Sequence, residues 1–366
     1  MKFTCNKEDI IKGINIVIRA AYSKYQKSIL ECIHIKTIRN AVLLDTFDMV
    51  TAIRTSVYAE VEKEGETAIP ARILYDIVMK FPSGEICFER EASSIRITGA
   101  NSMATLAEMD AAQFPAFPEI EGSKFSISRL LLKRMVDKTA FSAYSGEDRP
   151  IFTGLLFETD PQQNSISIVG IDGIRMAKNS AEIASSSAIR AVIPAKTLRE
   201  ASRIIGEDDS EVDLYFSNNA CFVVFGETAI FTRLLDGEYM NYKAIIPPEY
   251  KTRVKVETRL FERSLELMMV LAREDSSNLI RMSVENDAIA LHSVSEYGAA
   301  KDKVLVETEG ELIKIAFNAK YLLDIFKVVE EEKVYMEFNG RLQACVVRPV
   351  EGNEFLYLVV PVNVAE

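Results

Sequence analysis

Apolar positions along the chain follow two rhythms, and the same succession of rhythms occurs three times. Each succession opens on alternating apolar and polar residues, at Lys2–Cys5, Lys124–Ile127 or Arg253–Val256, which is typical of a strand with one buried face. Apolar residues three and four positions apart follow, as between Ile10 and Ile18, and predict a helix with one buried face. The matching helices of the other two successions carry Leu132, Met135 and Val136, and Leu260, Phe261, Leu265 and Met268.

Strand-like segments and a second helix complete each succession. We expect the second helix to begin after Pro70, Pro194 or Asn318, which are residue types common at helix starts. The predicted strands lie at 29–36, 151–158 and 280–284 before this helix, and at 85–88, 94–97, 212–216 and 221–225 after it.

The repetition has a constant period. Ala71, Ala195 and Ala319 stand in matching contexts at the start of the second predicted helix, 124 residues apart. Asp48 and Asp172 follow apolar strands and are also 124 residues apart. A fixed period is the mark of a repeated structural unit. Three unrelated α+β domains are the alternative, but equal spacing at two anchors is hard to explain in that case.

Proline-containing segments at 113–122 and 241–249 separate the three copies, because proline prevents a helix from continuing. The sequence therefore predicts an α+β protein with domains at 1–120, 121–247 and 248–366. In each domain, two helices are expected to pack on antiparallel sheet. A domain of about 120 residues is of common size.

Composition narrows the class of protein. Hydrophobic residues make up 48% of the chain, enough for packed cores, yet no apolar run approaches the ~18 residues of a membrane helix. The segment Met1–Glu8 turns polar too early for a secretory signal. The five cysteines lie far apart without a C-x-x-C pair, which favours a reducing, cytoplasmic location.

The net charge of −11 argues against a protein that coats nucleic acid with its whole surface. The predicted helices nevertheless segregate their cations on the polar face, as Lys196, Arg199 and Arg203 do. A solvated helix face is the ordinary interpretation. If equivalent helices share one surface, however, they would attract phosphates without reading bases. The helix cations predicted to contact DNA are Arg19, Arg72, Lys133, Lys138, Lys196, Arg199, Arg203, Arg263, Lys320 and Lys327.

Residues for catalysis are scarce. His34 and His292 are the two histidines, both in strand-like stretches, so neither a zinc site nor a histidine-based triad is indicated. The glycine-rich motifs that bind nucleotide phosphates do not occur. We therefore expect a protein that is no enzyme and needs no metal or cofactor. The alternative to a DNA-binding scaffold is an enzyme or a protein-interaction scaffold that is made of the same triplicated units and does not bind DNA.

Distinctive segments stand at Arg149–Glu158, Val169–Ala177, Thr232–Tyr242 and Tyr357–Val362. All four resemble one known family, the bacterial sliding clamps, which are beta subunits of the replicative DNA polymerase. Arg149–Glu158 resembles the start of the family's middle sheet, and Val169–Ala177 is similar to its T-D-G-x-R-[LM]-A signature. Thr232–Tyr242 and the C-terminal Tyr357–Val362 are similar to two further family elements. The resemblance covers the full length of the chain.

This resemblance implies a head-to-tail homodimer whose six domains form a ring around double-stranded DNA, with helices lining the hole. Such a ring is a replication processivity factor that slides without sequence specificity. The implied partners are the catalytic subunit of the replicative polymerase, the clamp-loader ATPase, and other polymerases and repair proteins with clamp-binding motifs, but no membrane. Leu106, Val270 and Leu271 match positions at the dimer interface, and Lys24 matches a DNA-contacting position.

The family also has a hydrophobic pocket between its middle and last domains that captures a short peptide motif of its partners. Apolar anchors in a preformed groove can supply most of the binding energy. Ile171, Met240 and Ala244 depart from the family pattern, which bears on the shape of the pocket and its partner preference but not on its existence. The matching pocket residues are Phe152, Gly173, Ile174, Arg175, Met176, Met240, Ile245, Leu358, Val360, Pro361 and Val362.

Overall fold

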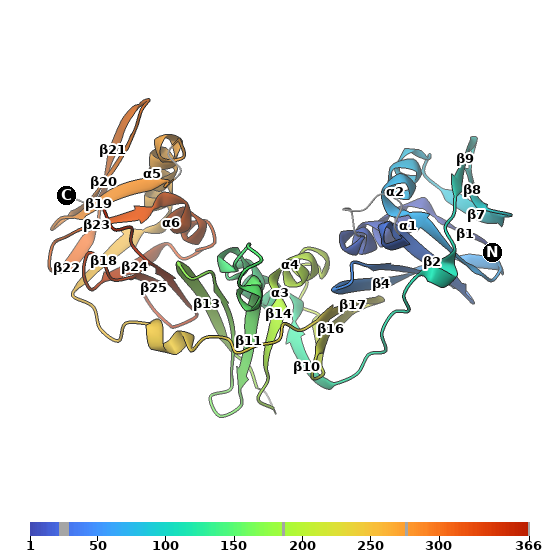
Figure 1. The fold of residues 1–366 in the computed structure, drawn as a ribbon, viewed down its shortest axis with the longest axis horizontal. Coiled ribbons are helices and arrows are strands. Elements are labelled where there is room, and N and C mark those ends of the chain that lie inside the picture. The colour runs from blue at the N-terminus through green and yellow to red at the C-terminus, as the bar shows by residue number, and fades with distance from the viewer. Residues whose placement is uncertain (22–28, 185–186, 275–276, 365–366) are drawn as a thin grey trace. The chain divides into compact units, whose positions relative to one another are not determined.

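The chain forms two compact units, and Figure 1 labels most of their helices and strands. Unit 1 comprises Met1–Leu132 and Glu200–Leu234, and unit 2 comprises Lys133–Arg199 and Leu235–Glu366. The middle third of the sequence thus contributes to both units. Within the part of the chain that is described, no helix combines the length and apolar character needed to cross a membrane. The structure, a computed structural model, describes residues 1–21, 29–184, 187–274 and 277–364.

The first copy of the repeat follows the predicted order of elements. These are β1 (Lys2–Asn6), α1 (Lys7–Val17), β2 (Cys32–Ile38), β3 (Ala41–Phe47), β4 (Thr51–Tyr58), β5 (Glu60–Lys63), β6 (Glu66–Pro70), α2 (Ala71–Lys80), β7 (Glu85–Glu91), β8 (Ser94–Gly99) and β9 (Ser102–Ala107). The Asn6 side chain accepts a hydrogen bond from the backbone N–H of Glu8 at 2.9 Å, which stabilises the start of α1. Helix α1 then buries the predicted residues Ile10, Ile14 and Val17.

The middle copy repeats this order. Its elements are β10 (Ser123–Ser128), α3 (Arg129–Asp137), β11 (Gly154–Asp160), β12 (Ser165–Ile171), β13 (Arg175–Glu182), β14 (Arg190–Pro194), α4 (Ala195–Ile204), β15 (Glu211–Phe216), β16 (Ala220–Phe225) and β17 (Thr228–Arg233). The predicted apolar residues of α3, Leu132, Met135 and Val136, are buried. The predicted helix is therefore confirmed.

The third copy has an extensive apolar core, in which α5 and α6 pack together through Phe261 and Phe326, with ring centroids 4.7 Å apart. The elements of this copy are β18 (Thr252–Glu257), α5 (Thr258–Ala272), β19 (Leu279–Val284), β20 (Ala288–Ser295), β21 (Gly298–Leu305), β22 (Glu307–Gly310), β23 (Ile313–Asn318), α6 (Ala319–Phe326), β24 (Lys333–Phe338), β25 (Cys345–Pro349) and β26 (Phe355–Val359).

All three copies share one pairing scheme. The first strand pairs antiparallel with the strand that follows the second helix: β1 with β7, β10 with β15, and β18 with β24. Three consecutive strands after the first helix form a meander, and the first of these pairs with the strand before the second helix. The repetition inferred from spacing is therefore a repetition of topology.

Local contacts also repeat. The second helices begin at Ala71, Ala195 and Ala319, as the sequence predicts. The Asp48 side chain accepts hydrogen bonds from the backbone N–H groups two and three residues ahead, at 3.2 and 2.7 Å. Asp172 does the same at 2.9 and 2.8 Å. These aspartates shape the same turn in two copies, which is why the residue type recurs.

Successive copies join by pairing their strands. The last strand of the middle copy, β17, pairs with β4 of the first copy, and β26 of the third copy pairs with β13 of the middle copy. Ile230 lies opposite Ile53 in the first junction, and Tyr357 lies opposite Ala177 in the second. By contrast, β9 and β21 are edge strands of their sheets.

Two strand boundaries and the burial of one residue differ from the sequence prediction. The strands expected from residues 29 and 151 begin later, at Cys32 and Gly154, because short 3₁₀ turns at Ile29–Glu31 and Pro150–Thr153 precede them. Proline at the first position of the second turn favours helical geometry over a strand. Leu260, expected on the buried face of α5, is 48% exposed, since its neighbour Phe261 occupies the core.

Candidate DNA and peptide interfaces

Most of the predicted DNA-contacting cations are exposed on helices. Arg72 and Arg203 make only short-range ion pairs, with Asp76 at 3.3 Å and Glu200 at 2.7 Å. Exposed pairs of this kind are weak, so both guanidinium groups can exchange a carboxylate for a phosphate. The exposed cations of this set are Arg72 on α2, Lys196 and Arg203 on α4, Arg263 on α5, Lys320 on α6 and Lys327 at its C-terminus.

Other cations of the set are held by the protein itself. The Lys138 ammonium is buried and lies 3.0 Å from Glu330 and 3.5 Å from Glu331. Arg19 pairs with Glu200 at 2.8 Å, and Arg199 donates to the carbonyl of Ala140. Lys138 would have to leave both glutamates to reach DNA, which makes it the weakest member of the set. Lys133, half-buried, lies 3.5 Å from Asp137, and Lys24 lies outside the described residues.

Four predicted pocket residues lie together in one apolar cluster of unit 2. Met176 and Leu358 are buried directly opposite one another on β13 and β26. Phe152 and Met240 pack on the same cluster half-buried. Tyr239 and Tyr242 also belong to the cluster, but the sequence analysis did not predict them as pocket residues. Both lie within Thr232–Tyr242, the segment that resembles the family. The signal that could have identified them was their position on either side of Met240, which was predicted as a pocket residue.

Exposed apolar side chains border this cluster. Ile174, Ile245 and Val360 are 44%, 38% and 41% exposed. The backbone N–H of Val360 donates to the carbonyl of Ile174 at 2.9 Å, which fixes these two side chains close together. Gly173 precedes them with φ +93°, a conformation that favours glycine. Exposed apolar side chains beside a buried cluster are typical of a peptide-binding surface.

Arg175 lies on the opposite face of β13 from Met176. Its guanidinium donates to Asp172 at 3.0 Å, to Asp324 of α6 at 2.6 Å and to the carbonyl of Phe141 at 2.8 Å. Successive strand residues point to opposite faces of a sheet, so Arg175 supports the helix side and not the apolar cluster. The structure does not bring it to the other predicted pocket residues.

The C-terminal segment continues from this region to β23. The backbone N–H of Val362 donates to the carbonyl of Ala316 at 2.8 Å, and half-buried Pro361 links it to Val360. Val362 lines a cavity of about 240 Å³ together with Arg281, Lys314 and Leu342. The C-terminal segment thus connects the apolar cluster with this cavity on the third copy.

The predicted dimer-interface residues lie on one edge strand and near the end of one helix. Leu106 on edge strand β9 is 8% exposed and faces the core of its own unit. Val270 near the end of α5 is 53% exposed, and Leu271 is half-buried. Edge strands present unpaired backbone groups that can pair with another chain.

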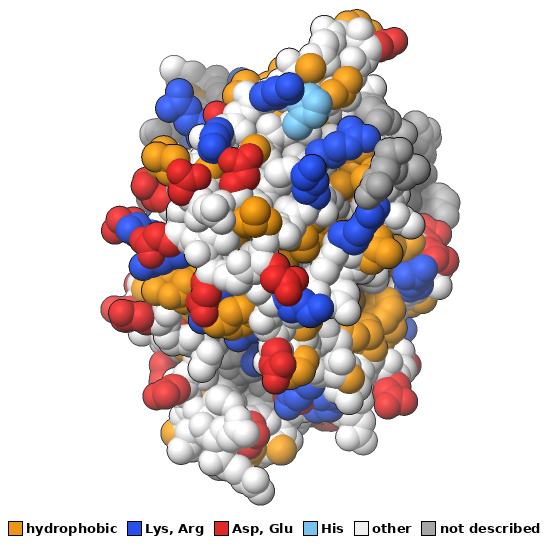
Figure 2. Space-filling view, turned by 90° about the vertical axis from the view of Figure 1, so that its left-hand side faces the viewer, with side chains coloured by type: hydrophobic (Ala, Val, Ile, Leu, Met, Phe, Trp, Pro, Cys, Tyr) orange, Lys and Arg blue, Asp and Glu red, His pale blue; other side chains and the backbone are white. Residues whose placement is uncertain are grey.

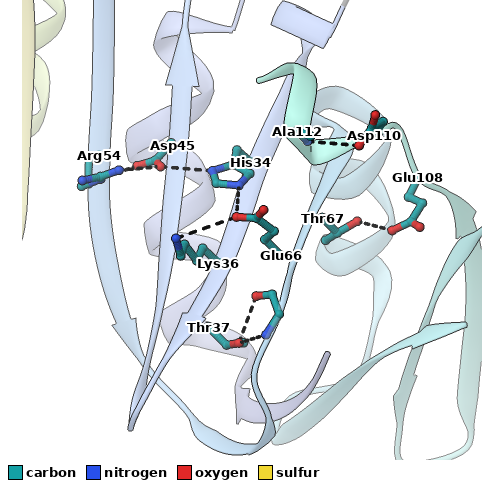
Figure 3. Close-up of polar contacts among 11 residues, drawn as sticks. His34, Lys36, Thr37, Asp45, Arg54, Glu66, Thr67, Glu108, Asp110 and Ala112 are labelled. Atoms are coloured by element: carbon teal, nitrogen blue, oxygen red, sulfur yellow. Dashed lines mark hydrogen bonds and ion pairs between the residues drawn. The ribbon is translucent and has the colours of Figure 1, made fainter. Parts of the chain in front are cut away.

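The residues around His34 form a polar network rather than a reactive site. Figure 3 shows Asp45 between His34 and Arg54, with His34 Nδ1 3.3 Å from Asp45 and Nε2 3.4 Å from Glu66. Both ring nitrogens therefore face carboxylates, and neither faces a hydroxyl or thiol. Among the described residues, no group of three His, Cys, Asp or Glu side chains could hold a metal ion. Burial raises the pKa of the Cys32 thiol to about 11, so that thiol stays protonated at neutral pH.

Models of three domains from one family match consecutive parts of the chain. The N-terminal domain of the DNA polymerase III beta subunit matches residues 1–118, its central domain matches 126–241, and its C-terminal domain matches 243–363. The chain belongs to the DNA polymerase III beta subunit family. The α+β fold of three tandem clamp domains is therefore confirmed, while the boundaries after residues 120 and 247 stay a prediction.

Curated relatives and solved structures of this family align over the whole chain. The beta sliding clamp of Staphylococcus epidermidis is 27% identical over 376 residues, which covers 99% of each protein. The DNA polymerase sliding clamp from Bacillus subtilis superimposes with a TM-score of 0.94 at 27% identity, and a putative DNA polymerase III beta subunit from Eubacterium rectale does so with 0.94 at 29%. Each structure covers the full length of both chains.

Proposed function

We propose that this chain is a sliding clamp of DNA replication, a homodimeric ring that encircles duplex DNA and slides on it. It tethers the replicative polymerase, and it serves the clamp-loader ATPase and other polymerases and repair proteins through the same peptide pocket. It is a binding scaffold and not an enzyme. Family membership supports this role, and a replication clamp acts in the cytoplasm.

The main support for a ring is that the series of strand junctions between copies is incomplete within one chain. Each junction within the chain pairs a last strand with the third meander strand of the preceding copy, as β17 does with β4 and β26 with β13. The last strand of the first copy, β9, and the third meander strand of the third copy, β21, are the two left at sheet edges. Pairing β9 of one chain with β21 of another would complete the series. Head-to-tail contacts form a ring when their rotation closes, and we propose that this one closes after two copies.

The strand pairing also gives a register for this junction. Following the ladders within each copy, Ile53, Ala177 and Ala300 are equivalent. In the same way, Ala104 is equivalent to Ile230 and Tyr357, which face Ile53 and Ala177. Ala104 should therefore lie opposite Ala300, and Met103 opposite Lys301.

Apolar exposure on both edges supports this pairing. Met103 on β9 is 69% exposed, Leu305 on β21 is 73% exposed, and Tyr297 in the preceding turn is 71% exposed. Long exposed apolar edges promote aggregation unless a partner covers them. Within the ring, the exposed helix cations would contact phosphates without sequence preference, and the cluster around Met176 and Leu358 would hold the apolar residues of a partner peptide.

Cross-linking tests the junction and its register together. In a Cys87→Ser background, Met103→Cys with Lys301→Cys should oxidise to a covalent ring, because directly opposite Cβ atoms lie about 4.5–5.5 Å apart. Met103→Cys with Lys303→Cys is the matched control, two residues out of register at about 7–8 Å. The covalent ring should stay on nicked circular DNA and leave it after linearisation. Equal cross-linking of both pairs, or a monomeric protein, would contradict the proposal.

A further inference from the structure

The three copies place three very different rows of side chains at one equivalent position. Each row runs across the three meander strands, on the sheet face turned away from the helices. The strand ladders align His34, Asp45 and Arg54 in the first copy, Leu156, Val169 and Lys178 in the middle copy, and Arg281, His292 and Lys301 in the third. Directly opposite residues on neighbouring strands share a face and interact.

The first row is neutralised and covered. Arg54 donates to Asp45 at 2.6 and 2.8 Å, and His34 lies 3.3 Å from the same carboxylate (Figure 3). The segment that follows the first copy packs on this row. Phe117 lies under the Arg54 guanidinium, with its centroid 4.4 Å away, and Phe114 stacks on His34 with centroids 5.2 Å apart.

The middle row is apolar at two of its three positions, with half-buried Lys178 at the third, and it too is covered by the segment that follows its copy. Leu156 and Val169 are buried in one cluster with Tyr239 and Tyr242. The Tyr239 hydroxyl donates to the carbonyl of Val169 at 3.2 Å. In both copies, therefore, the next stretch of chain supplies aromatic cover matched to the row beneath it.

The third row is basic and open. Arg281 and Lys301 are exposed on either side of half-buried His292, and neither cation forms an ion pair with the described carboxylates. Lys303 and Lys314 stand in the adjacent row of the same face, and of these Lys303 pairs with Glu285 at 2.8 Å. Figure 2 shows lysine and arginine side chains gathered around a histidine on the face that carries β19–β21. His292 on β20 separates Arg281 on β19 from Lys301 on β21. Among the described residues, the position that Asp45 holds in the first row therefore carries no carboxylate here.

We infer that the row of Arg281, His292 and Lys301 is a docking surface for an acidic polypeptide segment of a clamp-binding partner. The segment supplies the carboxylates that Asp45 supplies in the first row. The cavity beside Arg281 connects this docking surface with the C-terminal segment, because Arg281 and Lys314 line it together with Leu342 and Val362. A peptide held in the pocket at Val360 could continue along the C-terminal segment onto this face. The inference rests on the proposed peptide pocket for the anchoring of that partner.

A polypeptide fits this surface better than a nucleic acid does. The cavity walls combine three cations, Arg281, Lys314 and Arg341, with apolar side chains. The apolar side chains include Leu342, Val362 and Val364. This mixture suits alternating acidic and apolar side chains in a partner. An exposed cation gains little from one carboxylate, so several are needed. The net charge of −11 repels nucleic acid from most of the surface.

Two peptides distinguish binding at this docking surface from binding at the peptide pocket. Both contain the clamp-binding segment of the replicative polymerase from the same organism; one continues with four glutamates and the other with four glutamines. The glutamate peptide should bind the full-length protein about tenfold more tightly, the sum of a few exposed ion pairs. Arg281→Glu with Lys314→Glu should remove that advantage and leave the glutamine peptide within about twofold. Lys63→Glu with Lys80→Glu is the matched control, since both lysines are exposed in unit 1.

Each other outcome decides a different question. Equal affinity of the two peptides for the unaltered protein overturns the docking surface but leaves the pocket intact. If neither peptide binds, the pocket proposal fails, and a free hexaglutamate peptide then tests the surface alone through the same double variant. If a single-stranded oligonucleotide loses affinity in Arg281→Glu with Lys314→Glu while the glutamate tail has no effect, the surface binds nucleic acid and the inference is wrong.

Discussion

The outer faces of the first and third copies solve the same electrostatic problem in opposite ways. Asp45 in the first copy lies between two basic side chains, is buried, and is covered by Phe114 and Phe117. The equivalent position in the third copy is His292, between two exposed cations. The topology is identical, so the difference lies in what covers the sheet. Where a following segment of chain lies over the row, the charges are balanced internally. No described segment lies over the third row, and we propose that a partner occupies that surface.

The largest predicted difference between the two rows is in folding stability. Arg54→Ala leaves the buried Asp45 carboxylate without its main partner, at a cost of about 3 kcal/mol in the free energy of unfolding. Lys301→Ala, the same change in the third copy, should stay within about 0.5 kcal/mol, because its ammonium is solvated. Urea unfolding of both variants measures this. Similar losses in the two variants would mean that the rows are not different in kind.

The pH dependence of the first row gives a second, smaller contrast. Burial by itself raises the pKa of Asp45, but hydrogen bonds and charge from Arg54 and His34 lower it below its usual value. A carboxyl with a lowered folded pKa stabilises the protein above the unfolded pKa of about 3.9, and this stabilisation is lost as the pH falls through the folded pKa.

Asp45→Asn should therefore lower the free energy of unfolding by about 2 kcal/mol at pH 7 and by much less at pH 3. Urea unfolding at the two pH values tests this, with Asp76→Asn on the exposed face of α2 as the control. A difference between Asp45→Asn and the unaltered protein that is the same at both pH values would contradict the assigned role of the carboxylate.

Much of the fold could be predicted because the repeat leaves local signals. The helix-starting alanines at 71, 195 and 319 and the turn aspartates at 48 and 172 are set by backbone geometry within a few residues. A sequence period reports such positions directly. The pairing of β17 with β4 and of β26 with β13 depends on contacts between distant segments, and no local pattern announces it.

The candidate sites were predicted less completely, for two physical reasons. Neighbouring strand residues face opposite sides, so a motif that contains both Arg175 and Met176 cannot tell which one lies on the apolar cluster. The period also slips by one residue in the third meander. Counting 124 residues from Ala177 reaches Lys301, but the strand ladders place Ala300 there. Recognising the basic row requires that register and the positions of the covering segments.

The smallest predicted effect comes from making the third row resemble the first. His292→Asp places a carboxylate between Arg281 and Lys301, where Asp45 stands in the first copy. Two exposed ion pairs should raise the free energy of unfolding by about 0.5 kcal/mol. The same carboxylate should compete with an acidic partner and reduce the advantage of the glutamate-tailed peptide severalfold. His292→Asn controls for loss of the imidazole and should change neither quantity. If the aspartate variant binds the glutamate peptide as tightly as the asparagine variant does, the carboxylates of the peptide bind elsewhere, and the open row is simply a solvated surface.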